Sequence, residues 1–412
     1  MNFEEKQSEV ESMTCKGNFI DFSPPFIGDE EISEVVDTLR SSWITTGPKV
    51  KKFESEFADL VGSPAALAVS SATDAMLVGL AALGIGPGHE VITTPMTFCS
   101  TVHVIEHLGA KPVLVDVEPD TLNISPELVA QAITPRTRAI MPVHLYGHPC
   151  EMDTLQEVAK RYNLSIVEDA AHALPAVYKG RMIGTIGTFT AFSFYATKNL
   201  TTAEGGMLTG DRDLVEQARL WSLHGMSCDA HKRYSAQGSW YYEVVLPGFK
   251  CNMTDIQASL GLHQLKKLPA FQVRRREVVR AYNETFGKLA EVDLPVERPE
   301  VESAWHLYVL RLNLQRLTID RAQFIEELRA RGIGASVHFI PVHIHPYYRN
   351  KYGYRPEDFP IAYLNYQRIV SLPLNPRLSD QDVERIIEAV TEITAKFTKK
   401  QSYSAGVMLC NR

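Results

Sequence analysis

The sequence predicts an α/β protein with a mostly parallel, seven-stranded sheet covered by helices on both faces, followed by a smaller C-terminal α+β domain. Two observations support this fold class. Short apolar runs alternate with helical patterns between about residues 65 and 210, which is typical of parallel sheets. Runs such as residues 113–115 and 139–141 are also continuously apolar, as expected for strands that are buried on both faces.

Seven runs are predicted as strands, in chain order residues 66–69, 90–93, 112–117, 138–143, 165–169, 189–194 and 206–209. Between them, helices are predicted at residues 74–83, 99–108, 126–133 and 152–162. Ligands of such sheets bind outside the carboxyl ends of the strands. Residues that directly follow a strand are therefore the first candidates for a functional site.

The pattern changes after residue 255. A long helical pattern covers residues 255–289, and we expect a break at Pro269 because proline cannot donate a hydrogen bond inside a helix. Further along, we predict strands at residues 306–312 and 335–339 and helices at 320–331 and 380–397; a short helix is also expected at 30–41. The chain then divides into an N-terminal extension (1–22), a large domain (23–262), a small domain (263–398) and a tail (399–412).

Composition excludes several classes of protein. With 42 Lys and Arg against 49 Asp and Glu, the net charge of −7 argues against a nucleic-acid binder that relies on a positive field. The longest apolar stretch, residues 75–83, is about half of the ~20 residues that a membrane span needs. Six scattered cysteines without a C-x-x-C pair are typical of reduced thiols, so we expect a cytoplasmic protein with no nucleic-acid or membrane partner.

The segment from Ser70 to Thr73 directly follows the first predicted strand and opens a helix. Small residues there let backbone N–H groups approach an anion, and the helix dipole favours negative charge. An ordinary helix N-cap formed by serine or threonine is the alternative interpretation.

Two further motifs follow strands. Asp169 ends the strand at 165–169, and His172 comes three residues later; an N-cap aspartate is the alternative. Lys198 follows the strand at 189–194 and lies between a cluster of serine and threonine and the glycines 205 and 206. A lysine in this setting is expected to point inward, although single lysines usually lie on the solvated surface.

Together these residues predict a site for pyridoxal 5′-phosphate. This cofactor needs a phosphate cradle, an acid beside its pyridine nitrogen, a lysine that forms a Schiff base, and a flat apolar partner for its ring. Thr73, Asp169, Lys198 and Phe98 can supply these groups in turn. The ordered set, rather than any single motif, supports the prediction.

From about residue 19 to residue 397 the chain resembles the DegT/DnrJ/EryC1/StrS family of fold type I sugar aminotransferases. The motifs that carry the resemblance are residues 46–48, 53–54, 168–172, 193–199, 204–206 and 247–255. The resemblance implies that Lys198 forms the Schiff base, that Asp169 pairs with the pyridinium nitrogen and that His172 lies near the ring. It also implies that Ser71, Ala72, Thr73 and Ser193 hold the phosphate.

The resemblance further implies a homodimer with shared active sites, in which Lys250 or Asn252 reaches the phosphate of the neighbouring subunit. Two departures from the family pattern occur. Ala203 replaces a usual glycine near the cofactor lysine, and Lys-Cys-Asn at residues 250–252 replaces the commoner Asn-Tyr-Arg. These features resemble the subgroup of UDP-4-keto-sugar 4-aminotransferases that makes 4-amino-4-deoxy-arabinose, and they leave open which side chain crosses the interface.

Several histidines invite other interpretations. His338, His343 and His345 lie with Tyr347 in a segment that resembles the substrate-facing segment of the family, and imidazole donors and aromatic faces suit a sugar nucleotide. Metal binding is a weaker interpretation of two other clusters: Cys99, His103 and His107, and His144, His148 and Cys150. Buried helix residues and a turn explain these clusters better, so we predict no metal.

The predicted function is a pyridoxal-phosphate-dependent aminotransferase that converts a keto sugar on a nucleoside diphosphate to an amino sugar, with glutamate as the donor. A sugar dehydratase of the same family is the first alternative, but those relatives replace the lysine with histidine. An aldolase or a desulfurase of the same fold type, and a regulator that keeps the fold without catalysis, are the others. The sequence leaves open which sugar is used and whether nitrogen is added at C3 or C4.

Overall fold

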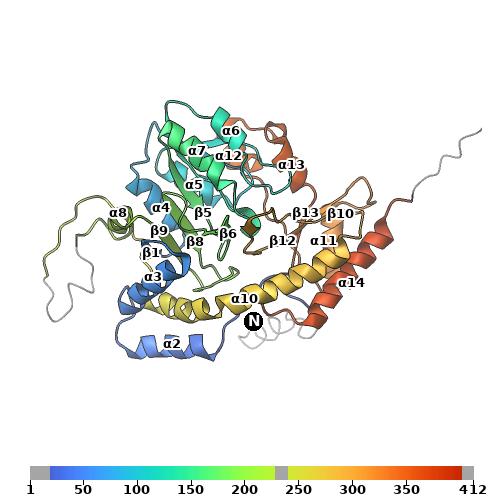
Figure 1. Cartoon of the computed structure of the whole chain (residues 1–412), viewed down its shortest axis with the longest axis horizontal. Coiled ribbons are helices and arrows are strands. Elements are labelled where there is room, and N and C mark those ends of the chain that lie inside the picture. The colour runs from blue at the N-terminus through green and yellow to red at the C-terminus, as the bar shows by residue number, and fades with distance from the viewer. Residues whose placement is uncertain (1–18, 228–239, 401–412) are drawn as a thin grey trace, which may run out of the picture.

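A seven-stranded sheet forms the centre of the computed structural model, which describes residues 19–227 and 240–400 (Figure 1). The strands lie side by side in the order β1 (Ala65–Val69), β9 (Gly206–Gly210), β8 (Phe189–Ser193), β5 (Ser165–Asp169), β4 (Thr137–Ile140), β2 (Glu90–Thr93) and β3 (Lys111–Leu114). Strand β9 runs antiparallel to β1 and β8, whereas the β5–β8, β4–β5, β2–β4 and β2–β3 pairs are parallel. The predicted mostly parallel seven-stranded sheet is confirmed.

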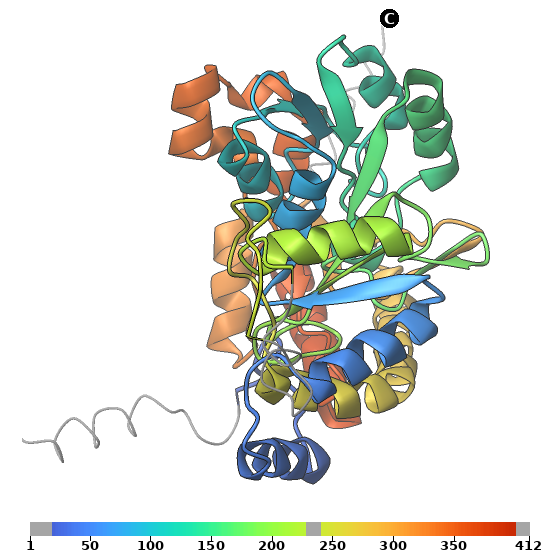
Figure 2. The ribbon, with the colours of Figure 1, turned by 90° about the vertical axis from the view of Figure 1, so that its left-hand side faces the viewer.

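Side chains of these strands alternate between two hydrophobic cores, one on each face of the sheet. One core contains Ile166 and Phe192, and the other contains Val167 and Phe189. Helices cover the first face with α3 (Pro48–Val61), α6 (Pro126–Gln131), α7 (Met152–Tyr162) and the start of α10 (Asp255–Phe286). Helices α4 (Ala72–Ala82), α5 (Ser100–His107) and α8 (Arg212–Ser222) cover the second face (Figure 2).

Helix α4 is the most deeply buried of these helices. Its residues from Ala75 to Ala81 are all buried, because it packs between the sheet and helices α5 and α8. Gly79 allows this close packing, since a Cβ there would lie 3.3 Å from a methyl carbon of Leu208. A helix that is apolar on all sides is expected in such a position.

The C-terminal part builds a second unit around its own core. Strands β10 (Val292–Asp293), β12 (Tyr308–Leu312) and β13 (Ile369–Leu372) form an antiparallel sheet, and helices α11 (Arg321–Ala330) and α14 (Asp380–Phe397) pack near it. Helix α10 joins the two units: Leu262 belongs to the core of the large sheet and Tyr282 to the second core. The predicted boundary between residues 262 and 263 falls inside this helix and stays a prediction.

Two sequence predictions in this part were wrong. Helix α10 continues through Pro269 without a break, and the buried neighbours Leu268 and Phe271 show why: packing on both sides of the proline offsets the missing hydrogen bond. Residues 335–339 do not form a strand, because they pair with the sheet only through the bridge from Ser336 to Ser371. The irregular backbone after Ser336 leads instead to the site described below.

Shorter elements complete the described chain. They are α2 (Asp29–Arg40), α12 (Pro346–Tyr352), α13 (Pro360–Tyr366), the 3-10 turns η1 (Leu145–Gly147), η2 (Val342–Ile344) and η3 (Pro356–Asp358), and the strands β6 (Val177–Tyr178), β7 (Arg181–Met182) and β11 (Val301–Glu302). Helix α2 lies against α10 at the edge of the molecule (Figure 1). Among the described helices, none has the length and apolar character to cross a bilayer.

Candidate active site

The carboxyl ends of β1, β5 and β8 and the start of β9 meet at one edge of the sheet, around a cavity of about 540 Å³. This volume lies in the usual range of small-molecule sites. Most of the residues predicted for the site line this cavity: Ser71, Ala72, Thr73, Phe98, Asp169, His172, Ser193, Lys198 and His338. The rule that ligands bind at strand ends therefore locates the cavity correctly.

The N-terminus of helix α4 forms one wall of the cavity. Ser71 caps the helix by accepting a hydrogen bond from the backbone N–H of Asp74, and its hydroxyl donates to the Asp74 carboxylate at 2.8 Å. Because the Ser71 hydroxyl is used in this cap, the groups that face an anion are the backbone N–H groups of the first turn and the Thr73 hydroxyl. Both alternatives from the sequence, a cap and an anion cradle, are compatible in this geometry.

Gly206 brings strand β9 against the same helix terminus. A Cβ on this residue would lie 2.4 Å from the carbonyl carbon of Ser71 and 2.6 Å from the backbone nitrogen of Ala72. Such distances are shorter than van der Waals contact, so only glycine fits unless the cradle moves.

We expect Gly206→Ala to weaken pyridoxal phosphate binding about 10- to 100-fold, because overpacking of about 1–3 kcal/mol displaces the first turn of α4. Titration of the cofactor-free protein, followed by absorbance, measures this affinity. Gly86→Ala is the matched control, since a Cβ there meets only the Leu108 carbonyl oxygen at 3.8 Å. Equal affinities of the two variants would contradict the assignment of the cradle.

Asp169 supplies a buried carboxylate at the end of β5. One oxygen accepts a hydrogen bond from the Thr101 hydroxyl at 2.7 Å, and the other accepts from the backbone N–H of Ala171 at 3.1 Å. Burial raises the pKa of Asp169 above its ordinary value, although these hydrogen bonds and the positive charge of Lys198 oppose the shift. A cationic N–H donor in the cavity would restore the charged form.

Lys198 lies in the turn after β8, where its backbone N–H donates to the Tyr195 carbonyl at 2.9 Å. Burial lowers the pKa of its amine to about 8, against the opposing effect of Asp169. A lysine with this pKa is partly neutral near physiological pH, and a neutral amine can act as a nucleophile or a base.

Aromatic rings form the remaining walls. The rings of His172 and Phe339 stack, with centroids 5.6 Å apart, and Phe98 lies 5.9 Å from Phe339. Phe98 is 58% exposed, so much of its ring faces open space. Burial, together with the charge of Lys198, lowers the pKa of His172 well below its ordinary value, which makes this imidazole neutral.

Lys250 and Asn252 do not line the cavity of their own chain. Lys250 is exposed and donates a hydrogen bond to Asn252, which donates in turn to the Thr46 hydroxyl at 2.6 Å. Their segment is paired with Val69 and Leu223 through β-bridges. The segment therefore lies beside the end of β1, with Lys250 exposed and Asn252 partly exposed, and neither side chain enters the cavity of the same chain.

The predicted substrate segment is only partly brought to the cavity. His338 lines it and shares a hydrogen bond of 2.9 Å between its Nδ1 and the Ser371 hydroxyl. His343 is fully buried, with its ring 4.8 Å from that of Phe359, while His345 and Tyr347 do not line the cavity either. The segment turns away after Phe339, because Val342 enters a hydrophobic core.

Other residues that line the cavity were missed in the sequence, and some of them come from distant segments. Phe22 stacks on His338 at 5.3 Å, and the Ser23 hydroxyl donates to the Thr197 carbonyl at 3.1 Å. His306 and Phe339 come from the C-terminal unit. Nearness in the chain could have found several others, since Thr97, Ala171 and Thr197 each lie within two residues of a predicted site residue.

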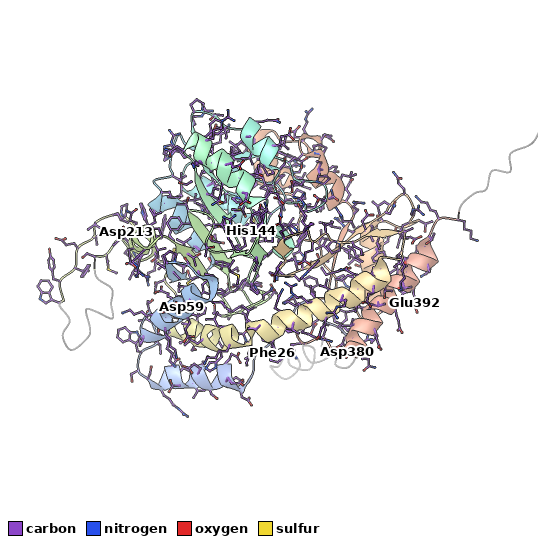
Figure 3. All side chains as sticks on the ribbon, viewed as in Figure 1. Phe26, Asp59, His144, Asp213, Asp380 and Glu392 are labelled. Carbon is purple, nitrogen blue, oxygen red and sulfur yellow. The ribbon has the colours of Figure 1, made fainter. Side chains whose placement is uncertain are left out.

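Glu168 and the proposed metal clusters have structural roles. The Glu168 carboxylate is buried away from the cavity and binds His144 at 2.8 Å, Thr190 at 2.7 Å and the backbone N–H of Gly187 at 2.6 Å. Figure 3 shows His144 in the interior of the large unit. Over residues 19–227 and 240–400, no cluster of histidine, cysteine and acidic side chains is arranged to hold a metal ion.

Comparison with known proteins adds independent information. Residues 25–391 match the sequence profile of the DegT/DnrJ/EryC1/StrS aminotransferase family. The spore coat polysaccharide biosynthesis protein SpsC of Bacillus subtilis is 52% identical over 380 residues, which cover 92% of this chain and 98% of SpsC. The uncharacterized protein MJ1066 of Methanocaldococcus jannaschii is also 52% identical, over 91% of this chain and 98% of its own length.

Solved structures of similar proteins share the fold. Spr1654 of Streptococcus pneumoniae, which is named as a sugar aminotransferase and was solved in its PLP form, matches with a TM-score of 0.86 and 40% identity over 92% of this chain and 99% of its own. PseC of Helicobacter pylori, an aminotransferase of pseudoaminic acid biosynthesis, matches with a TM-score of 0.85 and 29% identity over 92% and 100%. Both comparisons support the fold type I architecture that the sequence predicts.

Proposed function

Because the chain belongs to the DegT/DnrJ/EryC1/StrS aminotransferase family, we propose that it transfers an amino group from glutamate to a keto sugar carried on a nucleoside diphosphate. One observation carries this proposal: Lys198, Asp169 and the N-terminus of α4 converge on a single cavity. Relatives named for sugar amination and for polysaccharide biosynthesis support a sugar substrate.

Pyridoxal 5′-phosphate is the cofactor of this aminotransferase family, and the cavity fits it. The first turn of α4, with Thr73 and Ser193 beside it, offers neutral donors to a phosphate. Asp169 offers a buried carboxylate that suits a cationic ring nitrogen, because burial raises its pKa and a cation in the cavity would favour its charged form. Phe98 and His172 offer faces for a flat ring, and Lys198 offers an amine of lowered pKa.

When bound, the cofactor carries the amino group between substrates and withdraws electrons from the carbon that bears it. Lys198 would hold the cofactor through its Nζ. The same Nζ, whose pKa burial lowers to about 8 in the cofactor-free chain, would take a proton from the donor carbon and return one to the sugar carbon. Asp169 would keep a proton on the ring nitrogen through its negative charge.

The alternatives fit the chain less well. A dehydratase of this family would have histidine in place of Lys198, and a regulator without catalysis would not need a buried amine of lowered pKa beside a buried carboxylate. The three cysteines in the described chain, Cys99, Cys150 and Cys251, are free thiols. The cytoplasmic location, which the scattered cysteines suggested, stays a prediction.

A second copy of the chain is part of the proposal. A phosphate carries up to two negative charges, whereas Thr73, Ser193 and the helix terminus supply only neutral donors and a partial charge. Lys250 is exposed, does not line the cavity of its own chain and is hydrogen-bonded through its side chain only to Asn252 among the described residues, which supports a role at the cavity of a partner. We therefore include a homodimer with Lys250 or Asn252 completing the neighbouring site.

Mixing two inactive variants tests the shared site. We expect a Lys198→Ala chain combined with a chain changed at both Lys250 and Asn252 to regain up to half of the activity per dimer. In the heterodimer both defects would fall in one site and leave the other site intact. Activity after subunit exchange, compared with each variant alone, is the measurement.

The matched control mixes Lys198→Ala with Asp169→Asn. Both residues line the cavity of their own chain, so each site of this heterodimer keeps one defect and no activity should return. If the Lys250 and Asn252 mixture also regains nothing, although its subunits exchange, the residues do not act across the interface.

The function itself is tested by incubating the purified protein with glutamate and a panel of nucleoside-diphosphate keto sugars. Mass spectrometry and NMR of the products identify the sugar and show whether nitrogen is added at C3 or C4. Failure to aminate any member of the panel, by a protein that binds pyridoxal phosphate, would refute the proposed substrate class.

A further inference from the structure

Asn199, the residue after Lys198, is fixed by three hydrogen bonds. Its side-chain Nδ2 donates to the Leu174 carbonyl at 2.9 Å and to the Ala304 carbonyl at 2.8 Å. The amide cannot be reversed, because its oxygen would then face two carbonyl oxygens. Its Oδ1 must therefore be an acceptor, and this oxygen lies 3.1 Å from Nδ1 of His306.

The hydrogen bonds of Asn199 determine the tautomer of His306. Since Oδ1 of Asn199 accepts, Nδ1 of His306 carries the proton, and Nε2 of the neutral ring carries a lone pair. No residue in the described parts of the chain pairs with this Nε2, and the atom is not among the fully buried atoms that lack a partner. Because His306 lines the cavity, the lone pair is open to a ligand there.

The surroundings keep the His306 ring neutral. Burial lowers its pKa well below the ordinary value, and four neighbours that carry or can carry positive charge add to the effect: His172, Lys198, Arg275 and His338. Arg275 also donates to the backbone carbonyl of His306 at 3.3 Å, which holds the segment in place.

His172 has the opposite arrangement, although its ring centroid lies only 4.5 Å from that of His306. Its Nδ1 accepts from the backbone N–H of Tyr146 at 3.3 Å, so its proton is on Nε2. The cavity therefore holds one imidazole that donates through Nε2 beside one that accepts through Nε2.

We propose that His306 is a hydrogen-bond acceptor for a ligand O–H or N–H group in this cavity, and that Asn199 is the positioning residue that holds it in the accepting tautomer. The proposal rests on the proposed function for the identity of the ligands. Two of those ligands carry such donors, namely the hydroxyl groups of the sugar and the ammonium group of glutamate. A carboxylate has no proton to offer to this nitrogen.

Two substitutions distinguish the role of His306 as a hydrogen-bond acceptor from its hydrogen bond to Asn199. His306→Asn places an amide where Nδ1 was, so it keeps the bond to Asn199 and removes the acceptor. His306→Gln places an amide oxygen near the position of Nε2 and gives up the bond to Asn199. We expect His306→Asn to raise the KM of one substrate about tenfold, the loss typical of one hydrogen bond, and His306→Gln to recover part of this loss.

Separate measurement of the two half-reactions shows whether the sugar or glutamate donates the hydrogen bond to His306. Stopped-flow absorbance measures the reaction with glutamate alone, and the reverse reaction of the aminated enzyme with the keto sugar is measured separately. A defect confined to the sugar half-reaction identifies a hydroxyl group, and one confined to glutamate identifies the ammonium group. Equal defects in His306→Asn and His306→Gln, or none in either, would overturn the acceptor role.

Nuclear magnetic resonance tests the tautomer without activity. In holoenzyme labelled with ¹⁵N-histidine, we expect the Nε2 signal of His306, identified by its absence from His306→Asn, at the position of an unprotonated ring nitrogen. A protonated Nε2 would refute the inference. This result stands even if the protein shows no reaction with glutamate or sugars, so failure of the proposed function is recognised separately.

Asn199→Asp tests the positioning residue. A carboxylate beside Nδ1 favours the doubly protonated ring, which cannot accept a hydrogen bond. Its second oxygen faces the carbonyls of Leu174 and Ala304 in place of the donating amide, so the variant is also expected to be less stable than the wild type. We expect the affected KM to be raised at low pH and to recover as the pH rises through the new pKa of His306, whereas the wild type shows no such recovery. A KM that does not change with pH in a folded Asn199→Asp protein would contradict this role.

Discussion

Lys198→Ala is expected to reduce the rate of amino transfer by more than about 10⁴-fold. Removal of an acid–base group alone costs about 10²–10⁴-fold, and this variant also loses the covalent attachment of the cofactor. Purified wild-type protein should be yellow, and borohydride reduction followed by peptide mapping should label Lys198. A protein that stays colourless with added pyridoxal phosphate, or labelling of another lysine, would contradict the assignment.

The pH dependence of the same residue follows from its lowered pKa. With a pKa of about 8, the amine is protonated below this pH and neutral above it, so the rate with glutamate should rise as the pH increases through about 8. A rate that falls over this interval would exclude the neutral amine as the base. Single-turnover absorbance changes between pH 6.5 and 9.5 measure this profile.

Stability of the cofactor-free protein should change in the same sense as activity and rise with pH. The folded state disfavours the charged form of Lys198, so folding is penalised below about pH 8, and the penalty fades as the pH rises toward the ordinary pKa of the amine. Lys198→Met keeps the length of the side chain without its charge. We expect it to raise the unfolding free energy at pH 7 by about 1–3 kcal/mol, measured by denaturant titration.

Asp169→Asn is expected to slow the half-reaction with glutamate by at least about 100-fold, because the negative charge that holds a proton on the ring nitrogen is removed. The Asn side chain has nearly the same shape, so it can still accept a hydrogen bond from Thr101 or from Ala171. Cofactor should therefore still bind through its phosphate. Binding is measured by absorbance titration and the half-reaction by stopped flow.

Glu168→Gln is the matched control, since it changes the neighbouring carboxylate on the same strand. Glu168 faces away from the cavity, toward His144 and Thr190, so its loss should lower stability and leave the half-reaction within a few-fold of the wild type. If Asp169→Asn reacts at the wild-type rate while Glu168→Gln does not, the roles of the two acids are exchanged.

The sequence contained the central part of the site because local signals specify it. Asp169 ends a strand, and Thr73 and Lys198 come a few residues after one, and each of these strands can be recognised from its apolar residues. In a parallel sheet the carboxyl ends of strands meet at one edge, so recognising the strands was enough to bring these residues together. The fold class was predictable for the same reason.

Local patterns gave less information where tertiary packing competes with them. Pro269 suggests a helix break, yet α10 continues because it packs along its length against α2, α3 and α14. Residues 335–339 have the composition of a strand, but only Ser336 finds a partner. In both places, burial against a distant segment outweighs the preference of the local sequence.

The sequence alone therefore determined the fold class, because the alternation of apolar and helical runs encodes it. It also placed Lys198, Asp169 and Thr73 at strand ends, because their distances along the chain from the predicted strands are short. The tertiary structure alone decided that His306 and Phe339 join the cavity and that His343 turns away from it. It also decided that the Ser71 hydroxyl donates a hydrogen bond to Asp74 and that Asn199 fixes the tautomer of His306. These choices depend on contacts between segments far apart in the chain, where irregular loops carry no periodicity and the direction of each side chain is set by what it packs against.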